Sequence, residues 1–311
     1  MTGQSDHAEV GALLALMATR LPTVEELVGA ARVMRDKVDR LELGIPADQL
    51  LDTAGTGGAP KTFNVSTAAA IVAAASGAKV AKHGNRSRTG RGSAEVLDAL
   101  GVNVDAGREI QKSCMEAANV CFCFAIHHHP AAKHAMPVRK ALGFPTLFNL
   151  LGPLTNPAGA GRQVMGVYRP EFVRPVAEAL SRLDSVRALV MHSDEGLDEF
   201  SLGAPSTVAQ VDSGKVTEYR VDPVEMGLRP TPYQQLQARD LDHAVELVKT
   251  VLSGENRGPE RDIVLLNAAA AIYAADGADS LESALEVAAQ SIDFGTAMQT
   301  LDNLVEASKS G

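Results

Sequence analysis

The chain has 311 residues, of which 45% are hydrophobic and 22% charged, which suits one large domain, or a large domain with a small companion, around a sizeable core. Its 38 acidic and 29 basic residues give a formal charge of −9, which argues against a general nucleic-acid binder because such proteins present a broad basic surface. The sequence has no run of about 18 apolar residues and its first ten residues are polar and acidic, so we expect neither a membrane span nor a secretory leader.

Two helices are predicted in the N-terminal segment. Residues 8–17 are apolar and rich in alanine, and Thr23–Glu26 forms a capping box that favours a helix continuing to about Leu41. The Gly44–Pro46 sequence then interrupts the helical pattern. We therefore expect residues 1–46 to form a small all-helical domain.

Beyond residue 46, short apolar runs alternate with amphipathic helices. Strands are predicted over residues 49–53, 79–81, 120–124, 163–168 and 187–192, and helices over 66–76, 93–100, 130–142 and 170–183. Two later strands, over 207–211 and 216–221, flank a turn at Asp212–Lys215, and the tail from Leu241 to about Ser308 is typical of three or four helices.

The expected fold class is α/β, with a mostly parallel central sheet flanked by helices. Strands that are separated by helices imply right-handed crossovers, which make neighbouring strands parallel. Residues 47–311 would form this domain. Helices around residues 130–150 would join the small N-terminal domain.

The stretch from Thr53 to Ala94 carries six cations and no carboxylate, although the chain as a whole is acidic. The cations are Lys61, Lys79, Lys82, Arg86, Arg88 and Arg91. The stretch also holds two glycine-rich turns, Gly55–Gly58 and Gly90–Ser93, and glycines let backbone N–H groups approach phosphate oxygens closely. This pattern predicts a site for a small polyanion. A solvated basic face between two ordinary loops is the alternative.

Both glycine turns lie where a predicted strand gives way to a helix. The first turn precedes a helix opening at Ser66-Thr67, whose free N–H groups suit phosphate, and Asn64 and Ser66 lie two apart in a predicted extended lead-in, so they can point the same way. The Lys82–Arg86 segment follows the next strand. The carboxyl ends of parallel strands share one edge of a sheet, so the two loops should meet there. Neither a Walker A nor a GxGxxG pattern is present.

Cysteines and histidines give no catalytic or metal signal. Cys114, Cys121 and Cys123 are too few and odd in number for a disulfide framework, and we interpret them as buried structural thiols of a cytoplasmic protein. The run His127–His129 is a poor metal cluster, because consecutive residues of one strand point in opposite directions.

Taken together, these passages resemble the anthranilate phosphoribosyltransferase family. The resemblance continues through His128–His134, Pro137–Arg139, Phe148–Pro157 and Gly196–Glu199, and spans roughly residues 10 to 225. It implies transfer of phosphoribose from 5-phosphoribosyl 1-pyrophosphate (PRPP) to the amine of anthranilate. The products would be N-(5-phosphoribosyl)anthranilate and pyrophosphate, in tryptophan biosynthesis. It also implies small-molecule substrates rather than nucleic acid or membrane, a Mg²⁺ cofactor and a homodimer.

The resemblance assigns site residues by position. PRPP would be bound by Gly55, Gly57, Gly58, Thr62, Asn64, Ser66, Thr67, Lys82 and Ser93. Anthranilate would lie against Gly55, Asn85, His129, Arg139, Gly152 and Pro153. Magnesium, which prefers oxygen ligands, would be held by Ser66, Asp198 and Glu199.

Other interpretations of these residues stay open from the sequence alone. Asp198-Glu199 also fits an exposed loop pair, and Arg139 a cation near a helix C-terminus. We assign no catalytic residue. In the implied reaction pyrophosphate is the leaving group and the amine of anthranilate attacks an oxocarbenium-like ribose, so no protein nucleophile is required. Positioning and electrostatics would then supply most of the acceleration.

The chain departs from the family pattern in both phosphate loops. Ala59-Pro60 replaces an Asp-Gly pair, and Ser87–Ser93 replaces a serine-rich segment, with each loop shortened by about one residue. We hypothesise a variant grip on pyrophosphate that uses Arg88 and Arg91.

The front of the chain also departs from the family. Compared with the family's opening helical hairpin, about twenty residues are expected to be missing, which puts the dimer in question. Two rival functions remain: a same-fold phosphoribosyltransferase or phosphorylase with another aromatic acceptor, and a non-catalytic relative that binds nucleic acid.

Overall fold

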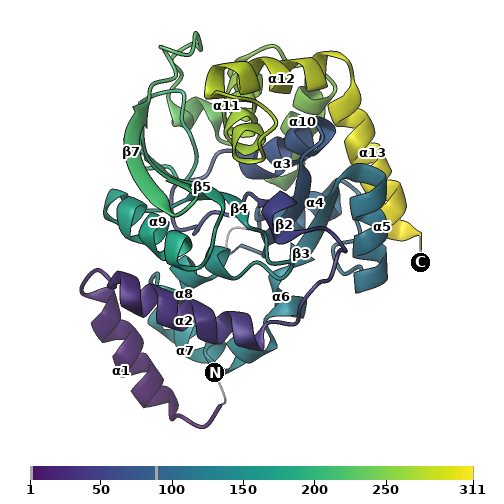
Figure 1. Ribbon diagram of the computed structural model, residues 1–311. Coiled ribbons are helices and arrows are strands. Elements are labelled where there is room, and N and C mark those ends of the chain that lie inside the picture. Colours follow the sequence, from purple (N-terminus) through teal and green to yellow (C-terminus); the bar gives the residue numbers. More distant parts are fainter. Residues whose placement is uncertain (1–2, 88–89, 311) are drawn as a thin grey trace.

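The computed structural model describes residues 3–87 and 90–310. Within them, seven strands form one sheet in the order β3-β2-β1-β4-β5-β6-β7 (Figure 1). The strands are β1 (Leu50–Asp52), β2 (Lys79–Gly84), β3 (Val120–Phe124), β4 (Arg162–Gly166), β5 (Arg187–Ser193), β6 (Ser206–Asp212) and β7 (Lys215–Val221). Strands β1 to β5 pair in parallel, and β6 and β7 are antiparallel. The predicted α/β class with a mostly parallel sheet is confirmed.

The hairpin at the sheet edge follows from its turn residues. Ser213 and Gly214 have φ of 49° and 87°, as a two-residue turn with both central residues left-handed requires. Asp212 therefore pairs with Lys215, and the hairpin predicted from the sequence is confirmed.

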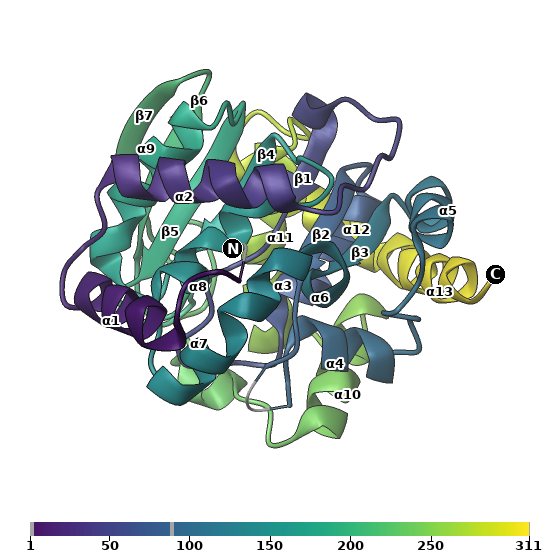
Figure 2. The same ribbon diagram turned by 90° about the horizontal axis from the view of Figure 1, so that it is seen from below.

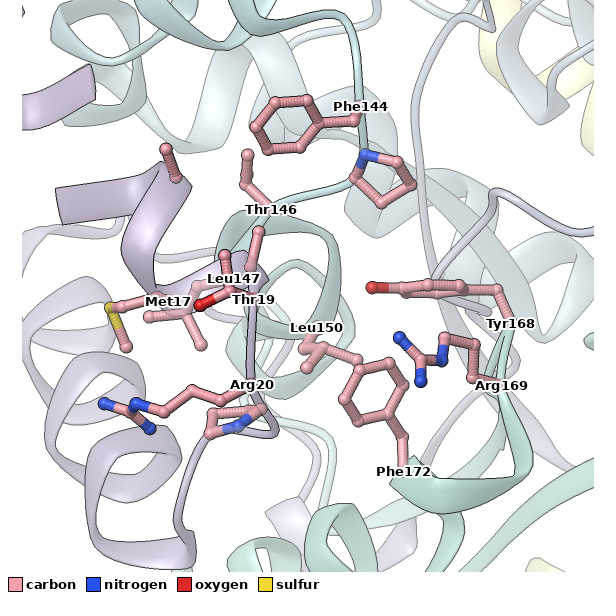
Figure 3. A pocket seen from close by; sticks show the side chains of 14 residues that line it. Met17, Thr19, Arg20, Phe144, Thr146, Leu147, Leu150, Tyr168, Arg169 and Phe172 are labelled. Atoms are coloured by element: carbon pink, nitrogen blue, oxygen red, sulfur yellow. The ribbon is translucent and has the colours of Figure 1, made fainter. Parts of the chain in front are cut away.

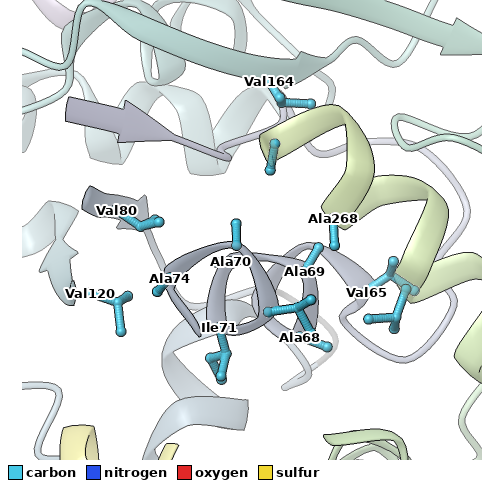
Figure 4. Close-up of a cluster of buried hydrophobic side chains, with 14 of the residues drawn as sticks. Val65, Ala68, Ala69, Ala70, Ile71, Ala74, Val80, Val120, Val164 and Ala268 are labelled. Atoms are coloured by element: carbon cyan, nitrogen blue, oxygen red, sulfur yellow. The ribbon is translucent and has the colours of Figure 1, made fainter. Parts of the chain in front are cut away.

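Helix α3 (Val65–Ala75) is the central helix of the core. Its run of alanines lets it pack closely between the sheet and α11 (Pro259–Ala274), and Figure 4 shows Ala70 and Ala74 directed toward Val80 and Val120 of the strands. Small side chains allow a helix to come near its neighbours on several sides at once. The start of α3 is thereby held at the carboxyl end of β1.

Two helix layers enclose the sheet. The layer with α3 also contains α4 (Ser93–Ala99), α5 (Arg108–Ala118), α10 (Leu241–Leu252), α12 (Leu281–Asp293) and α13 (Thr296–Lys309). On the opposite face, α9 (Val173–Arg182) packs on β5, β6 and β7 and is covered by α2 (Val24–Lys37). The helical tail is confirmed as four helices of the described residues, α10 to α13.

Helix α5 escaped prediction. Its buried positions are Gln111, Cys114, Met115 and Ala118, a regular stripe at helical spacing. A glutamine within that stripe hides it from a reading based on apolar residues.

The N-terminal helices pack on a cluster of short helices from the middle of the chain. Helix α1 (His7–Ala18) and α2 both begin with capping boxes, at Asp6 and Thr23. They lie against α7 (Met136–Leu142) and α8 (Leu147–Leu151), as Figure 2 shows, with α6 (Ala125–His128) beside them. Helix α2 ends at Lys37 rather than near Leu41.

The single helix predicted over 130–142 is wrong. A 3-10 segment, η2 (Pro130–His134), precedes α7, and Pro137 lies in the first turn of α7. Proline has no N–H to donate to the preceding turn, so the helix restarts there. None of the helices in the described residues is long and apolar enough to cross a membrane.

Candidate active site

The first glycine turn and the acidic pair come together in space. The Gly57 N–H donates to Asp198 Oδ2 over 2.9 Å, and the Thr62 hydroxyl donates to Glu199 Oε1 over 2.6 Å. The pair is therefore packed against the turn that follows β1 rather than lying on an exposed loop. The alternative of an exposed loop pair for Asp198-Glu199 does not hold.

The electrostatics of the acidic pair favour a cation. Burial, together with the negative charge of Asp198, raises the pKa of Glu199 to about 8, although the hydrogen bond from Thr62 opposes the shift. Burial also raises the pKa of Asp198, and the positive charge of Lys61 opposes that shift. Two carboxylates side by side in a poorly solvated place gain from a hard, divalent cation.

Gly166 allows the acidic pair to lie close to the end of β4. A Cβ at Gly166 would lie 1.7 Å from the Asp198 carbonyl oxygen and 2.3 Å from its carbonyl carbon. The Gly166 carbonyl also accepts the Thr56 N–H over 2.9 Å. Only glycine at the end of β4 lets the turn after β1 and the acidic pair close on each other.

Lys82 lies beneath the first turn. Its Nζ is 3.1 Å from Thr53 Oγ1 and 3.4 Å from Ser66 Oγ, and its side chain is almost completely buried. Burial lowers the pKa of Lys82 to about 8, while the charge of Asp52 acts in the opposite direction. This lysine therefore presents a cation to the first turn of α3, where backbone N–H groups also favour an anion.

The predicted extended lead-in to α3 is wrong. Asn64 caps the helix with a left-handed backbone, φ 74°, and Ser66 lies inside its first turn. The Asn64 side chain instead connects elements: it accepts from the Thr67 hydroxyl and donates to the Arg91 carbonyl over 3.3 Å. Asn64 thus joins the start of α3 to the second glycine loop.

The second loop has an internal anion. Glu95 accepts the Ser87 N–H over 3.2 Å and the Gly92 N–H over 3.0 Å. The Arg91 guanidinium donates to the Ala238 carbonyl through Nη1, so one of its three nitrogens is already engaged within the chain. Arg88, the other arginine of that hypothesis, lies outside the described residues.

Ser93 lies beside Asn85, at the end of β2. The Ser93 hydroxyl donates to the Asn85 carbonyl over 3.4 Å. A Cβ at Gly84 would lie 2.2 Å from the Ser93 hydroxyl oxygen, so glycine at this position gives Ser93 its place.

The predicted acceptor residues form a second group. His129 Nε2 is 3.1 Å from His83 Nε2, and His83 also hydrogen-bonds to the backbone of Gly152. Burial lowers the pKa of His83 to about 3 and that of His129 to about 4, with neighbouring histidine charges adding to both shifts. Both rings are therefore neutral near pH 7. Pro153 is buried, and its carbonyl accepts from Gln163 over 2.7 Å.

Arg139 lies on α7, at the helical side of this group. Its guanidinium carbon is 5.1 Å from the centre of the Phe148 ring, and Nη1 is 3.8 Å from the Met136 sulfur. Arg139 is partly exposed. Arg139 thus contacts Phe148 and Met136, which lie on the helical side of the acceptor group.

The histidine run is arranged differently from the prediction. His127 and His128 belong to helix α6, not to a strand, because β3 ends at Phe124. Their rings turn to different partners, Asp105 and the Asp39 carbonyl. Across the described residues, no group of three His, Cys, Asp or Glu side chains is placed to hold a metal ion. The three cysteines are free and buried, as expected.

Residues that the sequence reasoning missed connect the two groups. Asp52, His83 and Asn156 form a buried hydrogen-bonded set between Lys82 and Gly152. A charged residue at the end of the apolar Leu50–Asp52 strand was the available signal, since a buried carboxylate needs partners.

A cavity of about 540 Å³ lies on the helical side of the molecule (Figure 3). It opens between the end of α1, residues 144–150 and residues 168–172, and none of the predicted site residues lines it. A Cβ at Gly58 would lie 3.5 Å from Tyr168 and 3.8 Å from Pro145. The glycine turn therefore borders the wall of this cavity but is not part of it.

Comparison with known proteins defines the class. Residues 47–298 match the family model described as "Glycosyl transferase family, a/b domain", and residues 1–38 match "Glycosyl transferase family, helical bundle domain". The chain is thus a glycosyl transferase built from these two parts.

Relatives of known name narrow the class. The chain is 46% identical over 307 residues to the anthranilate phosphoribosyltransferase of Thioalkalivibrio sulfidiphilus, covering 98% of this chain and 90% of that one. The crystal structure of the Thermus thermophilus enzyme aligns with a TM-score of 0.93 at 40% identity, covering 99% and 92%. The Saccharomyces cerevisiae enzyme, solved in complex with PRPP and Mg, aligns with a TM-score of 0.87 at 27% identity, covering 98% and 86%.

The chain belongs to the anthranilate phosphoribosyltransferase family. The family and enzyme class predicted from the sequence are confirmed.

Proposed function

We propose that the chain transfers phosphoribose from PRPP to the amine of anthranilate and releases pyrophosphate, as a step of tryptophan biosynthesis. The observation that carries the proposal is the convergence of the Gly55–Gly58 turn, the start of α3, Lys82 and the acidic pair at one edge of the sheet. A cationic, amide-rich hollow beside two carboxylates suits a pyrophosphate with its divalent ion. The PRPP and Mg complex of the yeast relative supports the same assignment.

The PRPP site would use the residues of both loops. They are Gly55, Gly57, Gly58, Thr62, Asn64, Ser66, Thr67, Lys82 and Ser93. Lys82 and the free N–H groups of α3 would face the phosphoryl oxygens. The hydrogen bond between Gly57 and Asp198 would have to open for the Gly57 N–H to reach a phosphate.

Magnesium would be held by Ser66, Asp198 and Glu199. Burial beside Asp198 raises the pKa of Glu199, and a bound cation would stabilise the ionised form of both carboxylates. Mg²⁺ takes few protein ligands and completes its shell with waters and substrate phosphates, so two carboxylates and a hydroxyl suffice. When bound, the ion would offset the charge that grows on the departing pyrophosphate.

Anthranilate would lie against Gly55, Asn85, His129, Arg139, Gly152 and Pro153. The neutral His83–His129 pair offers a hydrogen-bonding edge without charge repulsion toward the amine. Arg139 has the fork geometry that a carboxylate accepts. Orientation of the amine toward the ribose carbon is the contribution we assign to this group.

Three further properties belong to the proposal. The chain divides into a helical domain, residues 1–46, and an α/β domain, residues 47–311, with the helices around 130–150 packing on the former. It forms a homodimer. It works in the cytoplasm.

The decisive assay follows the loss of anthranilate fluorescence on addition of PRPP and Mg²⁺. We expect consumption of anthranilate only when both are present, with other aromatic amines as controls. Faster consumption of a control amine would favour a same-fold transferase with another acceptor. No consumption of any amine, with nucleic-acid binding instead, would contradict the proposal.

A further inference from the structure

A buried carboxylate–amide pair lies between the phosphate-binding and acceptor-binding groups. Asp52, the last residue of β1, is fully buried, and Asn156 follows the 3-10 segment η3 (Pro153–Thr155). The Asn156 side-chain amide donates to Asp52 Oδ2 and to the Ala81 carbonyl, both over 2.8 Å. The other carboxylate oxygen, Asp52 Oδ1, accepts the His83 N–H over 3.0 Å.

The strand architecture does not require a carboxylate here. Parallel strands pair through their backbones, and an apolar residue at the end of β1 would avoid the cost of burying a charge. Burial raises the pKa of Asp52 to about 6, and the hydrogen bonds from Asn156 and His83 oppose that shift. Each carboxylate oxygen of Asp52 accepts a hydrogen bond, and the side chain is not exposed to solvent.

Asp52 interacts with residues of both the phosphate-binding group and the acceptor-binding group. Its charge acts on Lys82, whose Nζ lies 3.1 Å from Thr53 Oγ1 on the pyrophosphate side. The next residue along β2 is His83, whose backbone N–H donates to Asp52. The His83 ring contacts His129 and Gly152 on the acceptor side.

Asn156 fixes the acceptor side from the other end. Its Oδ1 accepts the Ala158 N–H over 2.9 Å, while its amide holds β1 and β2. The segment Gly152–Asn156 is thereby tied to the ends of the two strands that carry the phosphate loops. A shift of this segment would move Gly152 and Pro153 relative to Lys82.

We infer that Asp52 and Asn156 are positioning residues that set the acceptor-binding segment against the phosphate-binding lysine. The inference rests on the proposed function. A loss of alignment between two bound substrates lowers turnover more than binding, and misplacement by about 1 Å costs roughly 100-fold in rate. We therefore expect kcat to fall roughly 10- to 100-fold, with smaller changes in both KM values.

Three variants test the pair. Asn156→Ala removes the amide that holds Asp52 and Ala81. Asp52→Asn keeps the shape but places an amide where both neighbours donate, so one donor faces another. The exchange Asp52→Asn with Asn156→Asp restores a donor and an acceptor between the two positions, but it leaves the Ala81 carbonyl facing a carboxylate, so only part of the set is restored.

The matched control is Ser291→Ala. Ser291 is buried and bonded to Ser76 between α3 and α12, so its loss removes a buried hydrogen bond away from the proposed substrate groups. Melting temperature and both KM values are measured for every variant. Turnover of the unaltered protein tests the proposed function, whereas the ratio of variant to unaltered kcat tests the positioning inference.

We expect both single variants to lose kcat at temperatures where they stay folded, the exchange variant to regain part of it, and Ser291→Ala to keep it. Folded single variants that retain kcat within about twofold, or lose only binding, would overturn the inference. If one single variant does not fold, the other and the exchange variant still decide.

Discussion

Replacing Gly166 with alanine perturbs the contact on which the proposed magnesium site depends. The added Cβ would lie 1.7 Å from the Asp198 carbonyl oxygen and 2.9 Å from the Asp198 Cα. These are backbone atoms, which have no rotamer to change. The clash can be relieved only if the end of β4 and the acidic pair separate.

The magnitude follows from the overlap. A carbon–oxygen contact needs more than 3 Å, so the backbone must move by about 1 Å or more, and misplacement by about 1 Å costs roughly 100-fold in rate. Overpacking of this kind also lowers the free energy of unfolding by about 1–3 kcal/mol. We expect Gly166→Ala to reduce kcat/KM for PRPP about 100-fold and to require more Mg²⁺ for half-maximal rate.

The measurement is the initial rate of anthranilate consumption as a function of Mg²⁺ and PRPP, with thermal melting alongside. Gly29→Ala is the control, because a Cβ at this exposed position in α2 meets nothing within 4 Å; alanine should stabilise the helix by up to about 1 kcal/mol without changing activity. If Gly166→Ala kept its Mg²⁺ dependence and rate, the claim that close approach of Asp198 builds the site would be wrong.

Two further predictions concern the neighbouring groups. Burial lowers the pKa of His83 to about 3 and of His129 to about 4. Below about pH 6.5 the two imidazoles are therefore protonated in the unfolded chain but stay neutral in the folded chain. As the pH falls from about 6.5 toward 4, each ring lowers the free energy of unfolding by up to about 1.4 kcal/mol per pH unit. Urea unfolding of His129→Gln should show a shallower fall over that range, and parallel curves would contradict this reasoning. Arg91→Ala should lower the melting temperature, because the bond to the Ala238 carbonyl is lost, and should change the KM for PRPP less than threefold (about 0.6 kcal/mol); a larger rise in KM would favour a direct grip on pyrophosphate.

The strand and helix order was predictable because it rests on local signals. Alternating apolar runs, the capping box at Thr23 and the Asp212–Lys215 turn each determine their own element. The failures also have local causes. Pro137 divides one predicted helix, and a glutamine in the buried stripe of α5 hides another.

The site was only partly predictable. The stretch from Thr53 to Ala94 has no carboxylate of its own, but this says nothing about which carboxylates the fold brings next to it. Folding brings Asp52, Glu95, Asp198 and Glu199 to its backbone and side-chain donors. Carboxylates are therefore absent from this stretch of the sequence but lie around it in space. Contacts between residues 137 or 141 positions apart in the chain leave no trace in local spacing.

The backbone N–H of Gly57 donates to Asp198, and those of Ser87 and Gly92 donate to Glu95. The Gly55–Gly58 turn is consequently held against a carboxylate of the chain itself. Incoming phosphate would displace Asp198 from the Gly57 N–H, and the free energy of that exchange would contribute to the affinity for PRPP and to the release of pyrophosphate.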